Sequence, residues 1–416
     1  MIFTQHDFSQ ENCTCGKNHI TTIQKIVIES GCLPDLNKHL KELGYTEQVT
    51  AVYDSNTYRA SGLRRPAVSR EMILPAENLH ADEHGVELLM NRLSSPQLLV
   101  AIGSGTIHDI VRYCAAQLKI PYVSAPTAAT VDGFASSVAA MTLNGFKRTI
   151  IVQAPVLVLA DLEVISSAPR HLAASGVGDM LGKFICLADW EIAHALTGEY
   201  YCDYIASLTR KAAEQVLIGA DKLAVRDIGA YQNLMYGLIL SGVAMQLAGN
   251  SRPASGAEHH ISHLLEMGVL QRCDAMHGEK VGVATLLCAE LYHKLAQTED
   301  ISEALLPYKP IDEPWITEQF GRLAPEILAE NRPDCLQAVS PQQLKQNWNR
   351  IQDILRAVPS PQQLGDILKK LEGKASFEDI GVDTKLLPKL IALSPYVRNR
   401  LTVMRILRMM KTDSLF

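Results

Sequence analysis

Short apolar runs alternate with segments of helical periodicity over the first 165 residues, and this alternation constrains the fold more than any other feature. The apolar runs are bounded by Gly, Pro or Asp, as strands commonly are. They lie at 25–31, 48–54, 71–76, 97–103, 121–126 and 155–161, and helical patterns occupy 32–44 and 87–94. Strands separated by helices form βαβ units. We therefore expect an α/β fold with a Rossmann-like, mainly parallel sheet whose ligands bind at the carboxyl ends of the strands.

From about residue 165 the pattern changes to long helical periods. Helices are predicted at 179–198, 202–220, 228–249 and 279–297. The sequence therefore predicts two domains, an α/β domain of residues 1–165 and an all-α domain of residues 166–416, with the active-site cleft between them. The last helical pattern, 396–411, is basic and amphipathic, and we interpret it as a surface helix whose apolar side packs on its own domain.

The composition excludes several classes of protein. Lys and Arg number 39 against 45 Asp and Glu, and the resulting net charge of −6 disfavours general nucleic-acid binding. No uncharged apolar stretch reaches the roughly 18 residues that a membrane span needs, so we expect no stable membrane insertion. The first residues lack the basic and apolar regions of a secretory signal. The nine cysteines are odd in number and mostly scattered, which predicts free thiols and a cytoplasmic protein.

A glycine-rich turn follows the fourth of these apolar runs. In GSGTIHDIVRY, Gly103 and Gly105 permit close approach of backbone N–H groups to a phosphate. A helix beginning near Thr106 points its positive end at the same place. The match to the G-x-G-x-x-G pattern is incomplete because His108 takes its third glycine position. The turn therefore predicts a phosphate site only if other residues support it.

An acidic residue at a strand end supports a dinucleotide. Asp54 ends the run at 48–54, where a carboxylate can accept hydrogen bonds from a ribose 2′-OH and repels a 2′-phosphate. This placement favours NAD over NADP. A plain turn or helix cap is the alternative interpretation of the same residue.

The segment PTAATVDGFASS, residues 126–137, is dense in small and hydroxyl-bearing residues around one acid. Thr127, Thr130 and Ser136 can bond a nucleotide through their hydroxyls, and an apolar core strand has no need of Asp132. A polar loop explains the segment equally well. It therefore supports a nucleotide site only together with the glycine-rich turn.

One aspartate and two histidines form a candidate metal site. We expect GVGD, which ends at Asp179, to open the first helix of the second domain, and His259 and His277 lie near the starts of later helices. A carboxylate with two imidazoles leaves room for substrate oxygens, as in catalytic sites, and suits Zn²⁺, Fe²⁺ or Ni²⁺. His263 shares a helical face with His259, whereas His260 is rotated away by about 100°. Ordinary structural histidines remain the alternative.

The N-terminal segment CTCGKNH offers a second set of candidate ligands. Cys13, Cys15 and His19 suit part of a metal or redox site, but no second cysteine pair completes it. We interpret the segment as a loop that enters the first strand.

These motifs together resemble one family. GSGTIHD, PTAATVDGFASSVAAMTLNGFKRT, GVGD, SRPASGAEH and HGEKVG occur in the order and spacing of bacterial NAD(P)-dependent glycerol-1-phosphate dehydrogenases. That family is related to glycerol dehydrogenase, iron-type alcohol dehydrogenases and 3-dehydroquinate synthase. The resemblance extends from about residue 25 to RNRLTVMRIL near the C-terminus. One small departure is Thr130, where many relatives carry Ser.

The resemblance implies roles for the matching residues. It assigns the dinucleotide to Asp54, Gly103, Ser104, Gly105, Thr106, Ile107, Thr127, Ala128, Ala129, Thr130 and Ser136. It assigns substrate binding and catalysis to Asp132, Asp179 and His263, and one divalent metal ion per subunit, nickel or zinc, to Asp179, His259 and His277. Residues 1–165 then bind NAD, or alternatively NADP, and residues 166–416 bind metal and substrate. The resemblance also suggests a homodimer.

The implied reaction is reduction of dihydroxyacetone phosphate, a phosphorylated triose, to glycerol 1-phosphate. A metal would act as a Lewis acid on the C2 oxygen. Lys147, Arg148 and Arg252 are candidates for the substrate phosphate because they lie in the family-specific stretches. Three alternatives are a dehydrogenase of unphosphorylated glycerol or another polyol, a dehydroquinate synthase-like lyase, and a non-catalytic nucleotide binder.

Overall fold

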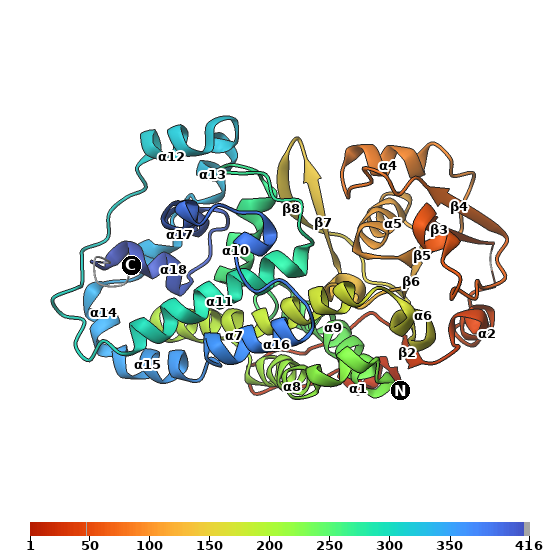
Figure 1. Cartoon of the computed structure of the whole chain (residues 1–416), viewed down its shortest axis with the longest axis horizontal. Helices are drawn as coiled ribbons and strands as arrows, with labels where there is room; N and C mark the ends of the chain where they lie inside the picture. Colours follow the sequence, from red (N-terminus) through yellow and green to blue (C-terminus); the bar gives the residue numbers. More distant parts are fainter. Residues whose placement is uncertain (47, 412–416) are drawn as a thin grey trace.

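A seven-stranded sheet forms one end of the molecule in the computed structural model, which describes residues 1–46 and 48–411 (Figure 1). Six of its strands pair in parallel, and only the N-terminal edge strand is antiparallel to its neighbour. In spatial order the strands are β1 (Ile2–Thr4), β2 (Lys25–Glu29), β9 (Leu157–Asp161), β6 (Tyr122–Pro126), β5 (Leu98–Gly103), β3 (Val49–Asp54) and β4 (Arg70–Leu74). The predicted mainly parallel α/β sheet is confirmed.

The apolar runs become strands because both faces of the sheet are covered. Successive side chains of β5 point to opposite faces, as the pleat requires. Leu98, Val100 and Ile102 join the apolar cluster with α2 (Leu36–Glu42), while Leu99 and Ala101 join the cluster with α4 (Glu83–Met90) and α5 (Gly105–Leu118). Burial on both faces explains why these strands read as continuous apolar runs rather than as an alternating pattern.

A two-stranded hairpin, β7 (Val138–Leu143) and β8 (Phe146–Ile151), was not expected from the apolar runs. Its turn is Asn144–Gly145, and both residues have positive φ, 54° and 76°. Asn-Gly is the preferred sequence for such a tight turn, so the dipeptide was the overlooked signal. Figure 1 shows the hairpin rising between the sheet and the helical part of the chain.

Helices make up the rest of the molecule. The predicted helices correspond to α7 (Arg170–Thr197), α8 (Asp203–Gly219), α9 (Ile228–Ala248) and α11 (His277–Ala296). The remaining helices after the sheet are α6 (Leu162–Ser167), α10 (Ala257–Glu266), α12 (Glu313–Phe320), α13 (Ala324–Glu330), α14 (Pro341–Gln346), α15 (Trp348–Arg356), α16 (Pro361–Lys370), α17 (Leu387–Leu393) and α18 (Val403–Ile406). Two shorter helices are α1 (Gln5–Phe8), between β1 and β2, and α3 (Ser55–Arg59), between β3 and β4. Within the described residues, no helix combines the length and apolarity that crossing a bilayer demands.

The proposed division at residue 165 falls inside α6, directly after the last strand of the sheet. Apolar residues of β2 and β9 share one cluster with α7 and α9, so the sheet and the helices are packed together. The two-domain division itself stays a prediction.

Two local predictions were wrong. GVGD does not open a helix: α7 begins at Arg170, after Pro169, and Gly176 therefore lies inside the helix. The segment 396–411 is not one surface helix. It contains the four-residue α18 and short 3₁₀ turns, and it is not on the surface, since Arg405 is buried and pairs with Asp334 at 2.8 Å.

Candidate functional site

Three helices bring the predicted metal ligands together. Asp179 comes from α7, His259 from α10 and His277 is the first residue of α11. One potential ligand atom from each lies within 4.8 Å of the other two, and His259 Nε2 is 3.7 Å from Asp179 Oδ1. Asp179 and His259 are buried, and His277 is partly exposed. The arrangement is a three-ligand set with one accessible side, which suits a catalytic rather than a closed structural metal site.

The glycines of GVGD explain how α7 reaches this position. A Cβ on Gly176 would lie 2.1 Å from the carbonyl oxygen of Ala129, and one on Gly178 would lie 2.3 Å from the carbonyl oxygen of Gly278. Any larger residue would therefore push α7 away from the 127–130 loop and from the start of α11. The motif is a requirement for close helix approach, and it holds Asp179 against both segments.

Carboxylates hold two of the histidine rings in a ligand-ready orientation. His259 Nδ1 lies 2.6 Å from Glu258 Oε1, and His277 Nδ1 lies 2.8 Å from Glu266 Oε1. An Nδ1–H that donates to a carboxylate leaves the lone pair of Nε2 for a metal. The residues present therefore fit a divalent metal ion. Neither glutamate was predicted from the sequence, although an acid directly precedes His259.

Lys183 links the metal set to the loop that carries Asp132, and the sequence analysis missed it. Its ammonium group lies 2.8 Å from Asp179 Oδ1, 2.7 Å from Asp132 Oδ2 and 2.9 Å from the carbonyl oxygen of Ala254. The backbone N–H of Asp132 also donates to Asp179 Oδ2, and Ser241 donates to Asp132 Oδ2. A lysine one helical turn after Asp179, in an otherwise apolar stretch, was the available signal.

This network fixes the charge of the metal set. Burial raises the pKa of Asp179, but the charges of Lys183, His259 and His277 outweigh burial and bring that pKa to about 2. Burial acts in the opposite direction on Lys183, and the two aspartates keep its pKa above the ordinary value. Asp179 is therefore a carboxylate and Lys183 an ammonium at neutral pH.

The third histidine of the predicted site, His263, lies beside the other two. Its ring centroid is 6.0 Å from those of both His259 and His277. Burial lowers the pKa of His263 well below its ordinary value, and the charge of Arg398 adds to the shift. Its Nδ1 has no hydrogen-bond partner within the described part of the chain. His263 is thus a neutral imidazole with a nitrogen available to a ligand.

The predicted dinucleotide residues lie along the carboxyl edge of neighbouring strands. Asp54 ends β3, Gly103 ends β5, and Thr127 directly follows β6 and donates its N–H to the Gly103 carbonyl at 3.1 Å. Ser104 precedes the first turn of α5, which contains Gly105, Thr106 and Ile107, and among the described residues no side chain caps that turn. The exposed N–H groups at the start of α5 suit a phosphate.

Asp54 also serves the alternative role predicted for it. Its carboxylate caps α3 by accepting the N–H groups of Asn56 and Thr57, both at 2.9 Å, and the Thr57 hydroxyl at 2.7 Å. The ribose interaction stays a prediction.

On the loop after Thr127, which continues through Ala128 and Ala129, the buried hydroxyl of Thr130 has no partner among the described residues. The Ser136 hydroxyl accepts the N–H of Val138 at 3.0 Å.

The three predicted phosphate-binding cations have different surroundings. Arg252 is buried and pairs with Glu199, and it also donates to the Leu401 carbonyl at 3.0 Å. Arg148 is exposed on β8. The side chain of Lys147 lies outside the described part of the structure. Arg252 is thus already paired with a carboxylate, which makes it a weaker candidate for binding the substrate phosphate.

Two further arginines come from the RNR sequence near the C-terminus, and Arg400 lies near both Arg252 and Arg398. Arg400 donates to the Ser255 carbonyl at 3.1 Å and to the Ser251 hydroxyl at 2.5 Å. Burial together with the charges of Arg252 and Arg398 lowers the pKa of Arg400 to about 10. Both Arg398 and Arg400 are partly exposed. The sequence analysis placed them on a surface helix and so did not connect them with the site.

Known proteins share both the sequence and the fold. The model of the iron-containing alcohol dehydrogenase family matches residues 27–169. The glycerol-1-phosphate dehydrogenase (NAD(P)+) of Bacillus licheniformis is 33% identical over 409 residues, covering 95% of this chain and 91% of that protein. The chain belongs to the glycerol-1-phosphate dehydrogenase family. A second member, from Geobacillus stearothermophilus, is also 33% identical and covers 94% of each chain.

A solved structure supports the fold assignment. Sulfoacetaldehyde reductase from Bifidobacterium kashiwanohense, in complex with NAD+, superposes with a TM-score of 0.61 at 15% identity. The match covers 92% of this chain and 94% of that protein. The family resemblance expected from the motifs is therefore confirmed, together with the fold.

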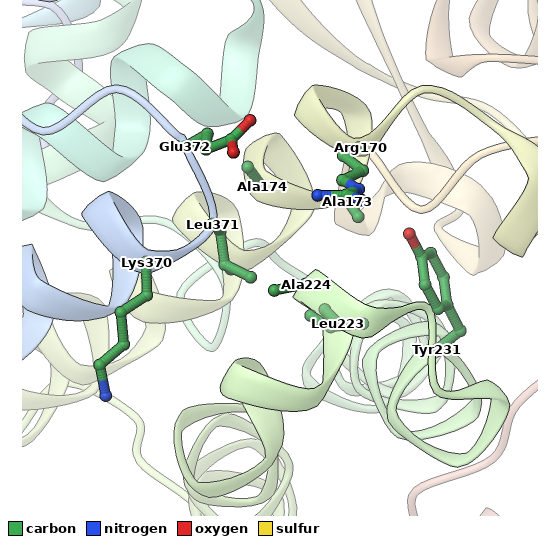
Figure 2. Close-up of a pocket in the computed structure, with 9 residues that line it drawn as sticks. All are labelled: Arg170, Ala173, Ala174, Leu223, Ala224, Tyr231, Lys370, Leu371 and Glu372. Atoms are coloured by element: carbon green, nitrogen blue, oxygen red, sulfur yellow. The ribbon is translucent and has the colours of Figure 1, made fainter.

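A small cavity elsewhere in the helical part is separate from these residues. It has a volume of about 50 Å³ and lies between α7, α9, the end of α16 and the turn at Ala220–Val225, here η3 (Figure 2). None of the residues predicted to bind metal, cofactor or substrate lines it. Such a volume holds a few water molecules and no nucleotide.

Proposed function

We propose that this member of the glycerol-1-phosphate dehydrogenase family reduces dihydroxyacetone phosphate to glycerol 1-phosphate with NADH as hydride donor. The observation that carries the proposal is the convergence of Asp179, His259 and His277 within 4.8 Å, at the place where the 127–136 loop of the α/β part meets α7. A divalent metal held by these residues supplies Lewis acidity for the carbonyl oxygen that becomes an alcohol.

The chain's own residues orient the reactants. The uncapped first turn of α5 and the strand ends around Gly103 bind the dinucleotide phosphates, and Thr130 offers a hydroxyl to the same ligand. His263 holds a substrate hydroxyl through its available nitrogen. Lys183 keeps Asp179 ionised and ties it to Asp132, so both carboxylates keep one geometry through the reaction.

The substrate phosphate fits Arg398, whose charge acts on His263, together with the neighbouring Arg400. Burial lowers both pKa values, and the positive charge of Arg398 further lowers the pKa of Arg400. A phosphate dianion relieves that repulsion and accepts several charge-assisted hydrogen bonds from guanidinium groups. This pair therefore favours a phosphorylated ketone over an unphosphorylated polyol.

One assay tests the reaction. Metal-free protein is reloaded with Ni²⁺ or Zn²⁺, and NADH oxidation is followed with dihydroxyacetone phosphate or dihydroxyacetone, and NAD+ reduction with glycerol. We expect turnover with the phosphorylated ketone far above that with either unphosphorylated compound. Turnover restricted to unphosphorylated compounds would establish a polyol dehydrogenase, and no redox turnover with either metal would refute the proposal.

A second assay tests the phosphate pocket. Arg398→Met removes charge-assisted hydrogen bonds worth about 1.5–3 kcal/mol each, so kcat/KM for dihydroxyacetone phosphate should fall by about 10- to 150-fold. The value for dihydroxyacetone should not change. Arg272→Met is the control, because Arg272 is exposed and pairs with Asp274 at the surface. Equal losses with both substrates would show that Arg398 does not recognise phosphate.

The finer assignments belong to the same proposal. We infer one nickel or zinc ion per subunit, NAD in preference to NADP because of Asp54, and a homodimer as in the family resemblance. Metal analysis of the active protein, KM values for the two reduced cofactors and sedimentation of the purified chain test them in turn.

A further inference from the structure

Three cysteines and one histidine form a cluster that shares no residue with the candidate active site. Cys13, Cys15 and His19 lie on one N-terminal loop, and Cys202 is the residue that precedes α8. One potential ligand atom from each of the four lies within 4.8 Å of the other three. The sequence offered no partner for the N-terminal segment. The fold supplies Cys202, which is 189 residues away from Cys13.

The distances within the cluster are close to those of a metal-ligand tetrahedron, and the two histidine–sulfur distances are slightly shorter. Cys13 Sγ and Cys202 Sγ are 3.7 Å apart, and His19 Nε2 lies 3.2 Å from Cys15 Sγ and 3.3 Å from Cys202 Sγ. Four ligands around Zn²⁺, with Zn–S of about 2.3 Å and Zn–N of about 2.0 Å, are separated by roughly 3.5–3.8 Å. A disulfide requires about 2.05 Å between sulfurs, so Cys13 and Cys202 are not bonded to each other.

The histidine is oriented for metal binding. His19 is buried, and its Nδ1 lies 2.9 Å from the carbonyl oxygen of Leu247. An Nδ1–H that donates to this carbonyl places the lone pair on Nε2, the atom that faces the sulfurs. Cys13 and Cys202 are also buried, whereas Cys15 is partly exposed and gives an ion a path into the cluster.

The N-terminal loop is held in shape by its own backbone. Gly16, with φ of 81°, donates its N–H to the Cys13 carbonyl at 2.9 Å, and Cys13 donates to the Lys17 carbonyl at 3.2 Å. Gln10 and His19 close the loop with two reciprocal N–H···O bonds of 2.9 Å. The left-handed conformation at Gly16 suits glycine and lets both cysteines of C-T-C-G face the same side.

We propose that Cys13, Cys15, His19 and Cys202 bind a structural zinc ion, distinct from the candidate catalytic metal. The four protein ligands leave no position for substrate, which is the mark of a structural site. Three thiolates and one neutral imidazole around Zn²⁺ carry a net charge of −1. Lys17 stands beside the cluster, with its Nζ 3.5 Å from the ring centroid of Tyr200, whose hydroxyl is 3.6 Å from Cys15 Sγ.

The ion would join the N-terminal segment to the helical part of the chain. Cys202 directly precedes α8, and the Leu247 carbonyl that holds His19 lies near the end of α9. One bound ion therefore crosslinks the loop that precedes β2 to the start of α8, and the hydrogen bond of His19 adds a contact with α9. Such a crosslink stabilises the folded chain because the ligands do not form a site when unfolded.

Cobalt substitution of the intact full-length chain is the direct test. The protein, purified under reducing conditions and stripped of metal, is titrated with Co²⁺. We expect a thiolate-to-cobalt charge-transfer band and the visible bands of tetrahedral cobalt, with the charge-transfer band complete by about two equivalents, when both candidate sites are filled. Asp179, His259 and His277 contribute no sulfur, so the candidate catalytic site cannot produce the charge-transfer band. Absence of that band, or a Cys13–Cys202 disulfide found by mass spectrometry in the reduced preparation, would overturn the proposal.

Metal counting with variants adds an independent measurement. After loading with Zn²⁺, His259→Ala should keep the thiolate-bound ion, and Cys202→Ser should lose one ion per chain together with the cobalt charge-transfer band. Cys114→Ser is the matched control, because Cys114 is also buried but lies in α5, outside the cluster. Because the cobalt spectrum uses the unaltered chain, the test holds even if Cys202→Ser fails to fold. An unchanged zinc count in a folded Cys202→Ser protein would contradict the proposal.

Discussion

Replacing Lys183 with methionine tests whether one buried ammonium group holds the two carboxylates of the candidate site together. Lys183 is fully buried, and its Nζ lies 2.8 Å from Asp179 Oδ1 and 2.7 Å from Asp132 Oδ2. Methionine keeps an unbranched apolar side chain of similar length and removes the charge. The substitution therefore leaves both carboxylates in place without their shared cation.

The expected cost follows from Coulomb's law and from burial. At an effective dielectric constant of about 20, each contact contributes roughly 6 kcal/mol before the cost of burying the charges is subtracted. Removing one partner of a buried ion pair costs about 3–5 kcal/mol in the free energy of unfolding. With an unfolding entropy of about 2.1 cal/mol/K per residue, a 416-residue chain should lose about 3–6 °C in Tm.

Calorimetry of the metal-free proteins at neutral pH measures this loss. Lys294→Met is the control, because Lys294 pairs with Glu290 on the exposed side of α11 at 2.9 Å. An exposed pair contributes about 0–1 kcal/mol, so the control should shift Tm by about 1 °C or less. Added Zn²⁺ should restore part of the Tm of Lys183→Met, because the ion replaces positive charge beside Asp179. If the Tm of Lys183→Met equals that of the control Lys294→Met, the ammonium group does not hold these carboxylates together.

Two further substitutions test the packing and the buried charges. Gly176→Ala should lower Tm by about 1–3 °C, because α7 has no room for a methyl group there. Gly219→Ala is the control and should change Tm little, because open space surrounds Gly219. Equal Tm values for the two variants would contradict the close approach of α7 to its neighbours. Asp334→Asn should cost about 3–5 kcal/mol in urea unfolding at neutral pH, because Arg405 and Arg408 lose their carboxylate. Although burial opposes them, those arginines lower the pKa of Asp334 in the folded chain. The wild type's higher free energy of unfolding is therefore fully present above the unfolded pKa of about 3.9, and it disappears as the pH falls through the folded pKa. A difference in free energy that persists in strong acid would refute the pairing.

Much of the site could be predicted because many of its residues lie in short sequence motifs. Gly103 ends a strand and Gly105 follows it, and His259 and His263 are one helical turn apart, so neighbours along the chain are neighbours in space. The residue types already made Asp179, His259 and His277 a candidate metal site, and the family resemblance favoured it over ordinary structural histidines, since no spacing rule joins residues on three different helices. The structure brings their ligand atoms together, and their role as metal ligands stays a proposal.

The residues that were missed share one property: their partners are distant in sequence or depend on burial. Lys183 reads as an ordinary helical lysine until Asp132, from the loop after β6, is placed against it. Arg405 reads as a surface cation until Asp334 is buried beside it.

The sequence alone determined where most strands and long helices form, because apolar periodicity and glycine or proline boundaries act over a few residues. Only the tertiary structure decided that Cys202 meets Cys13, Cys15 and His19. The physical reason for this meeting is packing. The shared apolar cluster brings α8 and the N-terminal loop together, and that contact depends on the whole core rather than on either segment.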